Sequence, residues 1–144
     1  MKVIGVDFGV KRTGTAICDE KETICYPLKL IEEEDEEVLV KKIAELFKQN
    51  AAEMLVVGVA VNMNGSFGEK AICCKNFAIR LKEFLKKPVA LWDERQTTLL
   101  ASRYMIESNT NRRKKKKIVD LVAATIILED FLAFKNNGNE IKLV

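Results

Sequence analysis

The chain has 144 residues, of which 48% are hydrophobic and 31% are charged, and this composition is that of an ordinary globular protein. A chain of this length buries about 70% of its unfolded surface without metal or disulfide staples, so we expect one domain over residues 1–144. The sequence contains no histidine. This excludes serine–histidine triads, histidine general bases and histidine-bound zinc, and any catalysis must use carboxylates, lysines or hydroxyls.

The charges are segregated along the chain although the net charge is only +3. Residues 32–37 form an unbroken acidic run, and residues 112–117 read RRKKKK. The acidic run precedes a helical pattern, where the helix dipole favours carboxylates, so it needs no functional explanation. The cationic run is either a solvated segment or a patch that contacts phosphates, and its composition leaves both interpretations open.

The cysteine spacing and the length of the apolar runs limit the cellular setting. Cys18, Cys25, Cys73 and Cys74 show no CxxC spacing, which predicts buried, reduced thiols instead of zinc ligands. The longest apolar run, residues 54–61, is much shorter than the roughly 18 to 20 residues of a membrane span. We therefore expect a cytoplasmic protein that does not bind membranes.

The first half of the chain contains four β-rich runs and one helical pattern. Residues 2–7 and 13–18 flank the turn-like segment FGVKR and predict a hairpin, and a third strand at residues 23–30 completes a meander. Apolar residues at spacings of three and four predict a helix over residues 35–49. The continuous apolar run at residues 54–61 predicts a central strand that is buried on both faces of a parallel sheet.

The second half of the chain continues the alternation of helix and strand. A Gly/Asn/Ser loop at residues 62–68 precedes a helical pattern over residues 71–86, and Pro88 then begins the short strand VALW. The remaining pattern predicts a helix over residues 96–107, a polar loop over residues 108–115 and a last helix over residues 118–134. The order predicts an α/β fold in which three antiparallel strands and two parallel strands form a mixed five-stranded sheet with helices on both faces.

Three acidic residues are expected at one edge of this sheet. Asp7 ends the first strand, Glu94 follows the strand VALW, and Asp120 lies in an otherwise apolar helix on the same face as Ala123 and Ala124. Functional groups of such sheets gather at the carboxyl ends of the strands. Because carboxylate oxygens suit Mg²⁺ or Mn²⁺ and no histidine is present, the three acids predict a site for one or two divalent metal ions.

Each acid also has an alternative, purely structural role. These roles are an ion pair of Asp7 with Lys11 or Arg12, a helix cap by Asp120, and a surface ion pair of Glu94 with Arg95. A carboxylate buried at the end of a strand without a partner would cost several kcal/mol, so Asp7 requires a cation of some kind. The convergence of all three acids favours the metal site over three separate structural roles.

Four stretches of sequence also occur in a specific order. They read GVDFGVKRTGTAICDE near the start, VVGVAVNMNGSFG in the middle, WDERQTT after the last strand, and KKKKIVDLVAATIILEDFL near the end. In these stretches the chain resembles, over essentially its whole length, the YqgF family, also called RuvX-like, of the RNase H-like superfamily. The resemblance implies an RNase H-like fold, and it aligns Asp7, Glu94 and Asp120 with the acids proposed as the catalytic set of the family.

The usual strand order of that superfamily has a consequence for Glu94. It places the strand before Glu94 two strands away from the strand of Asp7, about 10 Å at the ordinary spacing of strands. We therefore expect Glu94 to hold a second metal ion or to act through a water molecule.

The resemblance also implies a function. It implies a Mg²⁺- or Mn²⁺-dependent nuclease that acts on structured nucleic acid and processes the 5′ end of pre-16S ribosomal RNA. The alternatives are a Holliday-junction (four-way DNA) resolvase and a non-cleaving nucleic-acid-binding accessory protein of ribosome biogenesis or transcription. A kinase-like ATPase would need a second lobe, for which 144 residues leave no room.

Phosphate contacts are expected from the cationic residues Lys11, Arg12, Arg95, Arg112, Arg113, Lys114, Lys115, Lys116 and Lys117. The resemblance adds Asn62 as a further nucleic-acid-binding residue, since Arg12, Asn62, Gly65, Arg95 and Thr97 fall at positions of the family motifs.

Overall fold

The computed structural model describes residues 1–96 and 112–144, and within these ranges the side chains of residues 96 and 112–117 are left undescribed. The strands are β1 (Val3–Asp7), β2 (Arg12–Cys18), β3 (Cys25–Glu32), β4 (Met54–Val59), β5 (Val89–Asp93) and β6 (Lys142–Leu143). The helices are α1 (Glu36–Gln49), α2 (Glu69–Leu85) and α4 (Arg112–Asn136), and a 3-10 turn, η1 (Glu94–Gln96), follows β5. The helix predicted over residues 96–107 begins inside η1 and otherwise lies outside the described residues.

The strands form one mixed sheet in the order β3-β2-β1-β4-β5-β6. β1 pairs antiparallel with β2 and parallel with β4, and β4 pairs parallel with β5. The predicted α/β fold is therefore confirmed, and so is the separation of β1 and β5 by one intervening strand. The sixth strand, β6, was not predicted because a two-residue strand has too little sequence to show a period, and it forms only by pairing with β5.

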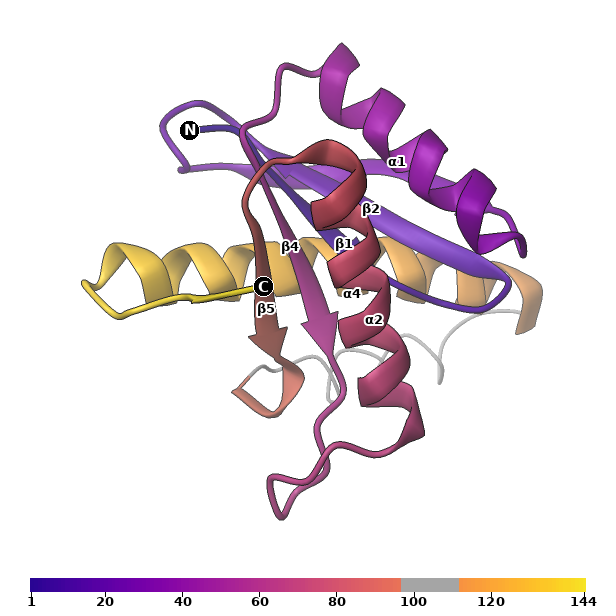
Figure 1. The fold of residues 1–144 in the computed structure, drawn as a ribbon. Coiled ribbons are helices and arrows are strands. Elements are labelled where there is room, and N and C mark those ends of the chain that lie inside the picture. The colour runs from indigo at the N-terminus through magenta and orange to yellow at the C-terminus, as the bar shows by residue number, and fades with distance from the viewer. Residues whose placement is uncertain (97–111) are drawn as a thin grey trace.

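Helices cover both faces of the sheet, as the sequence predicts (Figure 1). On one face α1 and α2 bury an apolar core that includes Phe77 and Leu81 of α2 against Leu55 of β4. On the other face α4 crosses the sheet and buries residues such as Leu128 against Val56 of β4. The central strand is buried over its whole length, which explains the continuous apolar run in its sequence.

The acidic run before α1 has the structural role that the sequence predicts. Asp35 is the N-cap residue, and its side chain accepts a hydrogen bond of 3.1 Å from the backbone N–H of Val38. Glu36 and Glu37 occupy the first turn, where the helix dipole favours negative charge.

The last helix begins earlier than the sequence predicts. α4 starts at Arg112, so residues 112–115, predicted as part of a polar loop, are helical. Lysine and arginine are good helix formers, and the long apolar face that follows anchors the helix to the sheet, so the cationic run continues the helix toward its N-terminus.

Glycines of the sheet allow α4 to lie directly on the strands. A methyl group placed on Gly14 of β2 would lie 2.0 Å from the carbonyl oxygen of Asp120, and one on Gly5 of β1 would lie 2.9 Å from the carbonyl oxygen of Ala124. Ala123 and Ala124 are fully buried at this contact. The two glycines and the two alanines together permit this close approach of α4 to the sheet.

Candidate active site at the carboxyl edge of the sheet

Asp7 is the last residue of β1, and it is 8% exposed. Val3 and Gly5 of the same strand face α4, and side chains alternate along a strand, so Asp7 faces α4 as well. Its register partner on β2 is Gly14. The carboxylate therefore lies beside the point where the α4 backbone rests on the sheet.

Asp120 comes to this point from α4. Its backbone carbonyl lies over Gly14, the register partner of Asp7. Its carboxylate Oδ2 accepts a hydrogen bond of 3.3 Å from Nε of Arg12, the first residue of β2, and both side chains are about a quarter exposed. Arg12 thus forms its ion pair with Asp120, and the pair ties the β1–β2 hairpin to α4.

Glu94 reaches the same face of the sheet from beyond β5. A methyl group placed on Gly58 of β4 would lie 2.8 Å from Oε1 of Glu94 and 2.5 Å from Cδ1 of Ile127. The carboxylate therefore occupies the space over β4 that a larger residue at position 58 would fill. Because β4 lies between β1 and β5, Glu94 leans over β4 on the α4 side, which is the side that Asp7 faces.

The role of Gly58 was not predicted from the sequence. It stands inside the strand MLVVGV, where the neighbours are bulky and apolar. A glycine in a strand interior often marks the close approach of another group. That signal was present in the sequence, but only the structure identifies Glu94 and Ile127 as the groups that approach.

Cys74 lies buried on α2 near these acids. Burial raises the pKa of its thiol to about 11, and the negative charges of Glu94 and Asp7 contribute to the rise. A thiol with this pKa is almost fully protonated at neutral pH and is a poor nucleophile. The four cysteines are all in the described part of the chain and are unpaired, but Cys73 is exposed, so the prediction of buried thiols is wrong at that position.

Arg95 pairs with Asp93. Its Nη2 lies 2.6 Å from Oδ2 of Asp93, its Nε lies 3.1 Å from Oδ1, and its backbone N–H also donates to Oδ1. This contact lowers the pKa of the Asp93 carboxyl. The guanidinium group of Arg95 is thus held by Asp93.

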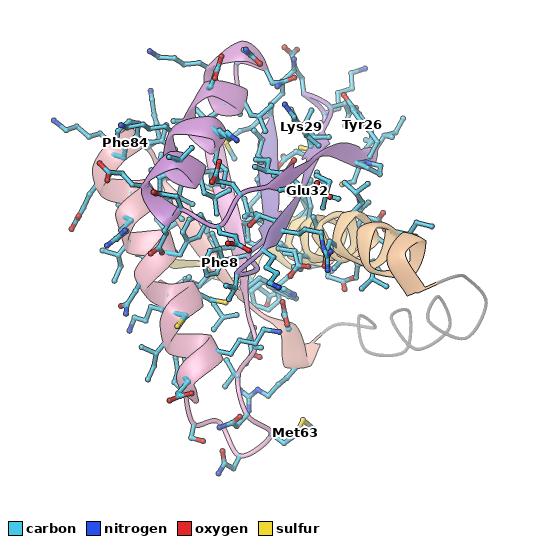
Figure 2. All side chains as sticks on the ribbon, turned by 90° about the vertical axis from the view of Figure 1, so that its right-hand side faces the viewer. Phe8, Tyr26, Lys29, Glu32, Met63 and Phe84 are labelled. Atoms are coloured by element: carbon cyan, nitrogen blue, oxygen red, sulfur yellow. The ribbon has the colours of Figure 1, made fainter. Side chains whose placement is uncertain are left out.

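The loop after β4 also belongs to this edge. Asn62 donates from Nδ2 to Oγ of Ser66 at 3.1 Å and accepts at its carbonyl from the N–H of Gly65, which has a φ of +88°. Nη1 of Arg95 donates to the carbonyl of Met63 at 3.4 Å. The loop is thus held to η1, and it presents Met63, 84% exposed, at its tip (Figure 2).

The remaining predicted phosphate contacts differ in how far the structure describes them. Lys11 is exposed in the turn between β1 and β2, on the same hairpin as Asp7 and Arg12. The side chains of residues 112–117 lie outside the described part, as does the whole of Thr97. The backbone of residues 112–117 is the N-terminal part of the helix that carries Asp120.

The carboxylate oxygens at this edge of the sheet suit a hard divalent cation, but they do not surround one. Among the described residues, no three acidic, histidine or cysteine side chains are close enough together to hold a metal ion by themselves. Mg²⁺ usually binds proteins through one or two carboxylates, and substrate phosphates and water complete its coordination. Asp7, Asp120 and Glu94 fit this open kind of site in their chemistry.

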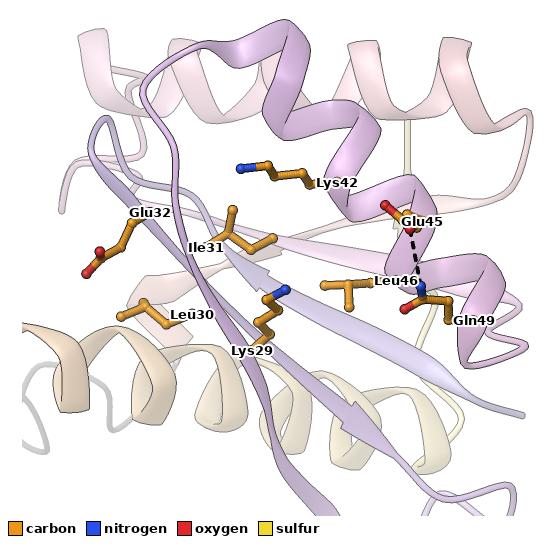
Figure 3. A pocket seen from close by; sticks show the side chains of 8 residues that line it. All are labelled: Lys29, Leu30, Ile31, Glu32, Lys42, Glu45, Leu46 and Gln49. Atoms are coloured by element: carbon orange, nitrogen blue, oxygen red, sulfur yellow. Dashed lines mark hydrogen bonds between the residues drawn. The ribbon is translucent and has the colours of Figure 1, made fainter.

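A groove between β3 and α1 lies apart from this edge (Figure 3). Its volume is about 260 Å³, and Lys29, Lys42 and Glu45 are among the residues that line it. Glu45 accepts a hydrogen bond of 3.3 Å from Gln49. None of the candidate site residues lines this groove.

Two solved structures share the architecture of this chain. The chain superimposes on Thermus thermophilus RuvC in complex with a Holliday junction substrate with a TM-score of 0.64 at 13% identity, covering 100% of this chain and 99% of that one. It superimposes on the fowlpox virus Holliday junction resolvase with a TM-score of 0.54 at 13% identity, covering 96% and 100%. These likenesses define the fold as RNase H-like.

Sequence comparison defines the family. The model of the RuvX family, described as Holliday junction resolvase, matches residues 1–134. Relatives from Bacillus thuringiensis strain Al Hakam and Bacillus cereus strain AH820 are each 39% identical over 137 residues, covering 94% of this chain and 100% of theirs, and each carries the name "Putative pre-16S rRNA nuclease". The chain belongs to the RuvX (YqgF) family.

Proposed function

We propose that the protein is a divalent-metal-dependent nuclease that hydrolyses phosphodiester bonds and processes the 5′ end of pre-16S ribosomal RNA. The observation that carries this proposal is the arrangement of Asp7, Asp120 and Glu94 on the α4 side of the carboxyl edge. Nucleases of the RNase H-like fold generally use divalent metal ions. Family membership and the names of the relatives support hydrolysis of phosphodiester bonds.

Each acid has a separate part in this proposal. Asp7 and Asp120 hold a divalent ion, Mg²⁺ or Mn²⁺, which would supply Lewis-acid stabilisation of the reacting phosphate. Arg12 keeps Asp120 in place through its ion pair. Glu94 holds a second ion or orients the attacking water from its position over Gly58.

Cationic residues around the edge supply affinity for the nucleic-acid backbone. Lys11 projects from the same hairpin as Asp7, and residues 112–117 precede Asp120 on α4. Contacts of this kind hold phosphates without reading sequence. They therefore fit a structured RNA substrate and also a four-way DNA junction.

We propose a cytoplasmic setting for this role. Across residues 1–96 and 112–144, none of the helices has the length and apolar character needed to cross a bilayer. Precursor ribosomal RNA of bacteria is made in the cytoplasm, and we propose that the protein acts there.

Two substrates offered side by side test the function. Purified protein is incubated with a fragment that spans the 5′ end of pre-16S rRNA and, separately, with a four-way DNA junction, each in Mg²⁺, in Mn²⁺ and in EDTA. We expect metal-dependent shortening of the RNA. Cleavage of the junction alone would replace the RNA assignment by the resolvase, and binding without product in either metal would identify an accessory protein.

Glu94→Gln is expected to slow cleavage by about 10- to 100-fold, the range seen when the support of a metal site is weakened. If Glu94 holds a second ion, high Mg²⁺ or Mn²⁺ restores part of the rate by mass action. If Glu94 orients or deprotonates water, added metal does not restore it, and the pH dependence of the rate changes shape. The measurement is a metal titration of the cleavage rate at two pH values.

Glu83→Gln is the matched control for this test, because Glu83 is exposed on α2 and the same chemical change there leaves the edge untouched. Unchanged activity of Glu94→Gln under every condition would remove Glu94 from the site.

A further inference from the structure

A second cavity, here called the edge pocket, opens beside the proposed active site. Its volume is about 320 Å³, and its lining includes Phe67 from the loop after β4, Trp92 of β5, Arg95 of η1 and Lys142 of β6. Arg95 is the residue next to Glu94, so the pocket begins one residue from the proposed catalytic set. Its volume falls at the lower end of the range for small-molecule sites.

Phe67 presents an aromatic ring with two cations near it. Phe67 is 37% exposed, and the Nζ atoms of Lys75 and Lys142 lie 5.7 and 5.8 Å from the centroid of its ring. An exposed aromatic ring flanked by ammonium groups has the composition of a platform for a base and its phosphates. The neighbouring guanidinium of Arg95 is held flat against Asp93 by several hydrogen bonds, and planar guanidinium groups also stack on bases.

Trp92 also lines the edge pocket and carries a buried polar group. It packs edge-on against Phe131 and Phe134, with ring centroids 6.3 and 5.4 Å away. Trp92 is 5% exposed, and its indole nitrogen is buried without a hydrogen-bond partner in the described part of the chain. Almost all buried N–H groups have a partner. A nucleobase carries carbonyl and ring-nitrogen acceptors of the kind that this donor lacks.

We propose that the edge pocket receives one unstacked nucleobase of the nucleic-acid substrate, on the Glu94 side of the proposed active site. This proposal rests on the proposed function, since it specifies that the nuclease acts where a nucleotide is unpaired. Phe67 stacks on the base, and the ammonium groups of Lys75 and Lys142 contact the adjoining phosphates.

Stacking of a base on Phe67 is expected to be stronger than the cation–π contacts that the two lysines make with this ring in the free protein. An exposed cation–π contact strengthens an interaction by about 2- to 5-fold, whereas stacking of one base on an aromatic side chain contributes about 5- to 150-fold in affinity. A base therefore displaces an ammonium group from the ring, and that ammonium group keeps its attraction to the phosphates.

Trp92 allows the pocket to be observed directly, because it is the single tryptophan of the chain. Wild-type protein is titrated in EDTA with adenosine 5′-monophosphate and, separately, with ribose 5-phosphate, and the tryptophan fluorescence is followed. We expect a saturable change with the nucleotide and none with the sugar phosphate. Equal responses to both compounds, or no response to either, would overturn the proposal.

Phe67→Ala tests the platform in an Asp7→Asn background, where the substrate is not cleaved. We expect its affinity for a labelled single-stranded oligoribonucleotide to fall by about 5- to 150-fold. Phe84→Ala is the matched control, because Phe84 is 53% exposed near the opposite end of α2, far from Met63 (Figure 2), and should bind as the Asp7→Asn parent does. Circular dichroism checks that both variants are folded, and parental affinity in Phe67→Ala would overturn the proposal.

These binding tests separate the pocket from the nuclease. If the wild-type protein cleaves RNA but its tryptophan fluorescence does not change with the nucleotide, the proposed function stands and the base site in the edge pocket is ruled out. If the fluorescence changes with the nucleotide and Phe67→Ala weakens RNA binding, but the wild-type protein cleaves neither substrate, the base site stands and the nuclease function is ruled out.

Discussion

Asp7→Asn is expected to reduce phosphodiester hydrolysis by about a thousandfold or more while the protein remains folded. Asp7 is almost fully buried at the end of β1, and its charge is what a divalent ion at this edge would neutralise. Loss of a metal ion costs several kcal/mol of transition-state stabilisation, and each 1.4 kcal/mol is a factor of ten in rate. The measurement is the rate of RNA cleavage in Mg²⁺ and in Mn²⁺, together with the circular dichroism spectrum and the affinity for RNA.

Glu45→Gln makes the same carboxylate-to-amide change on α1, where Glu45 contacts the exposed side chain of Gln49, and it should keep full activity. A contaminating nuclease would be unaffected by Asp7→Asn. Unfolding of Asp7→Asn would instead show that Asp7 has a structural ion pair, which is the alternative that the sequence leaves open.

Gly14→Ala is expected to lower both stability and activity. The added methyl group would lie 2.0 Å from the carbonyl oxygen of Asp120 and 2.6 Å from its carbonyl carbon, and a backbone group cannot rotate away as a side chain can. Overpacking costs about 1 to 3 kcal/mol and occasionally more. We expect the upper end of this range, which lowers the Tm by about 10 °C in a domain of this size. Because α4 must move, Asp120 is displaced and cleavage falls as well.

Gly68→Ser is the control for this prediction. Gly68 is the N-cap of α2, with a φ of −76°, and serine is a favoured N-cap residue. Its added Cβ would meet only the side-chain amide of Asn62, at 3.3 Å. Thermal unfolding followed by circular dichroism compares the two variants, and a wild-type Tm for Gly14→Ala would show that α4 does not rest on β2 as described.

Features that depend on local pattern could be predicted from the sequence. The run MLVVGV gave the buried central strand, and the spacing of apolar residues gave α1 and α2. Asp7 and Glu94 could be assigned to one edge because the ends of their strands meet there by topology, and Asp120 could be added because it shares a helix face with Ala123 and Ala124. The N-terminal extension of α4 could not be predicted. The segment RRKKKK is typical of a polar loop by composition, but the apolar face that follows it anchors the helix to the sheet and makes the segment helical.

Pairings between distant residues could not be predicted. Arg12 and Asp120 are 108 positions apart, and the sequence offered Asp7 as an equally reasonable partner for Arg12. Arg95 had acids at both preceding positions, and which of them it binds depends on the alternation of side chains at the end of β5. The edge pocket was also missed, because Phe67, Trp92 and Lys142 come from three separate segments.

The early start of α4 has a consequence for the length of nucleic acid that the protein can engage. An α-helix rises about 1.5 Å per residue, so Lys117 and Arg112 precede Asp120 by about 4.5 and 12 Å along the axis. Phosphates of one strand follow each other at about 3.4 Å along a duplex axis. In the proposed function, residues 112–117 would therefore contact phosphates about one to four nucleotides to one side of the cleaved bond, and shorter overhangs on that side would engage only part of the cationic run.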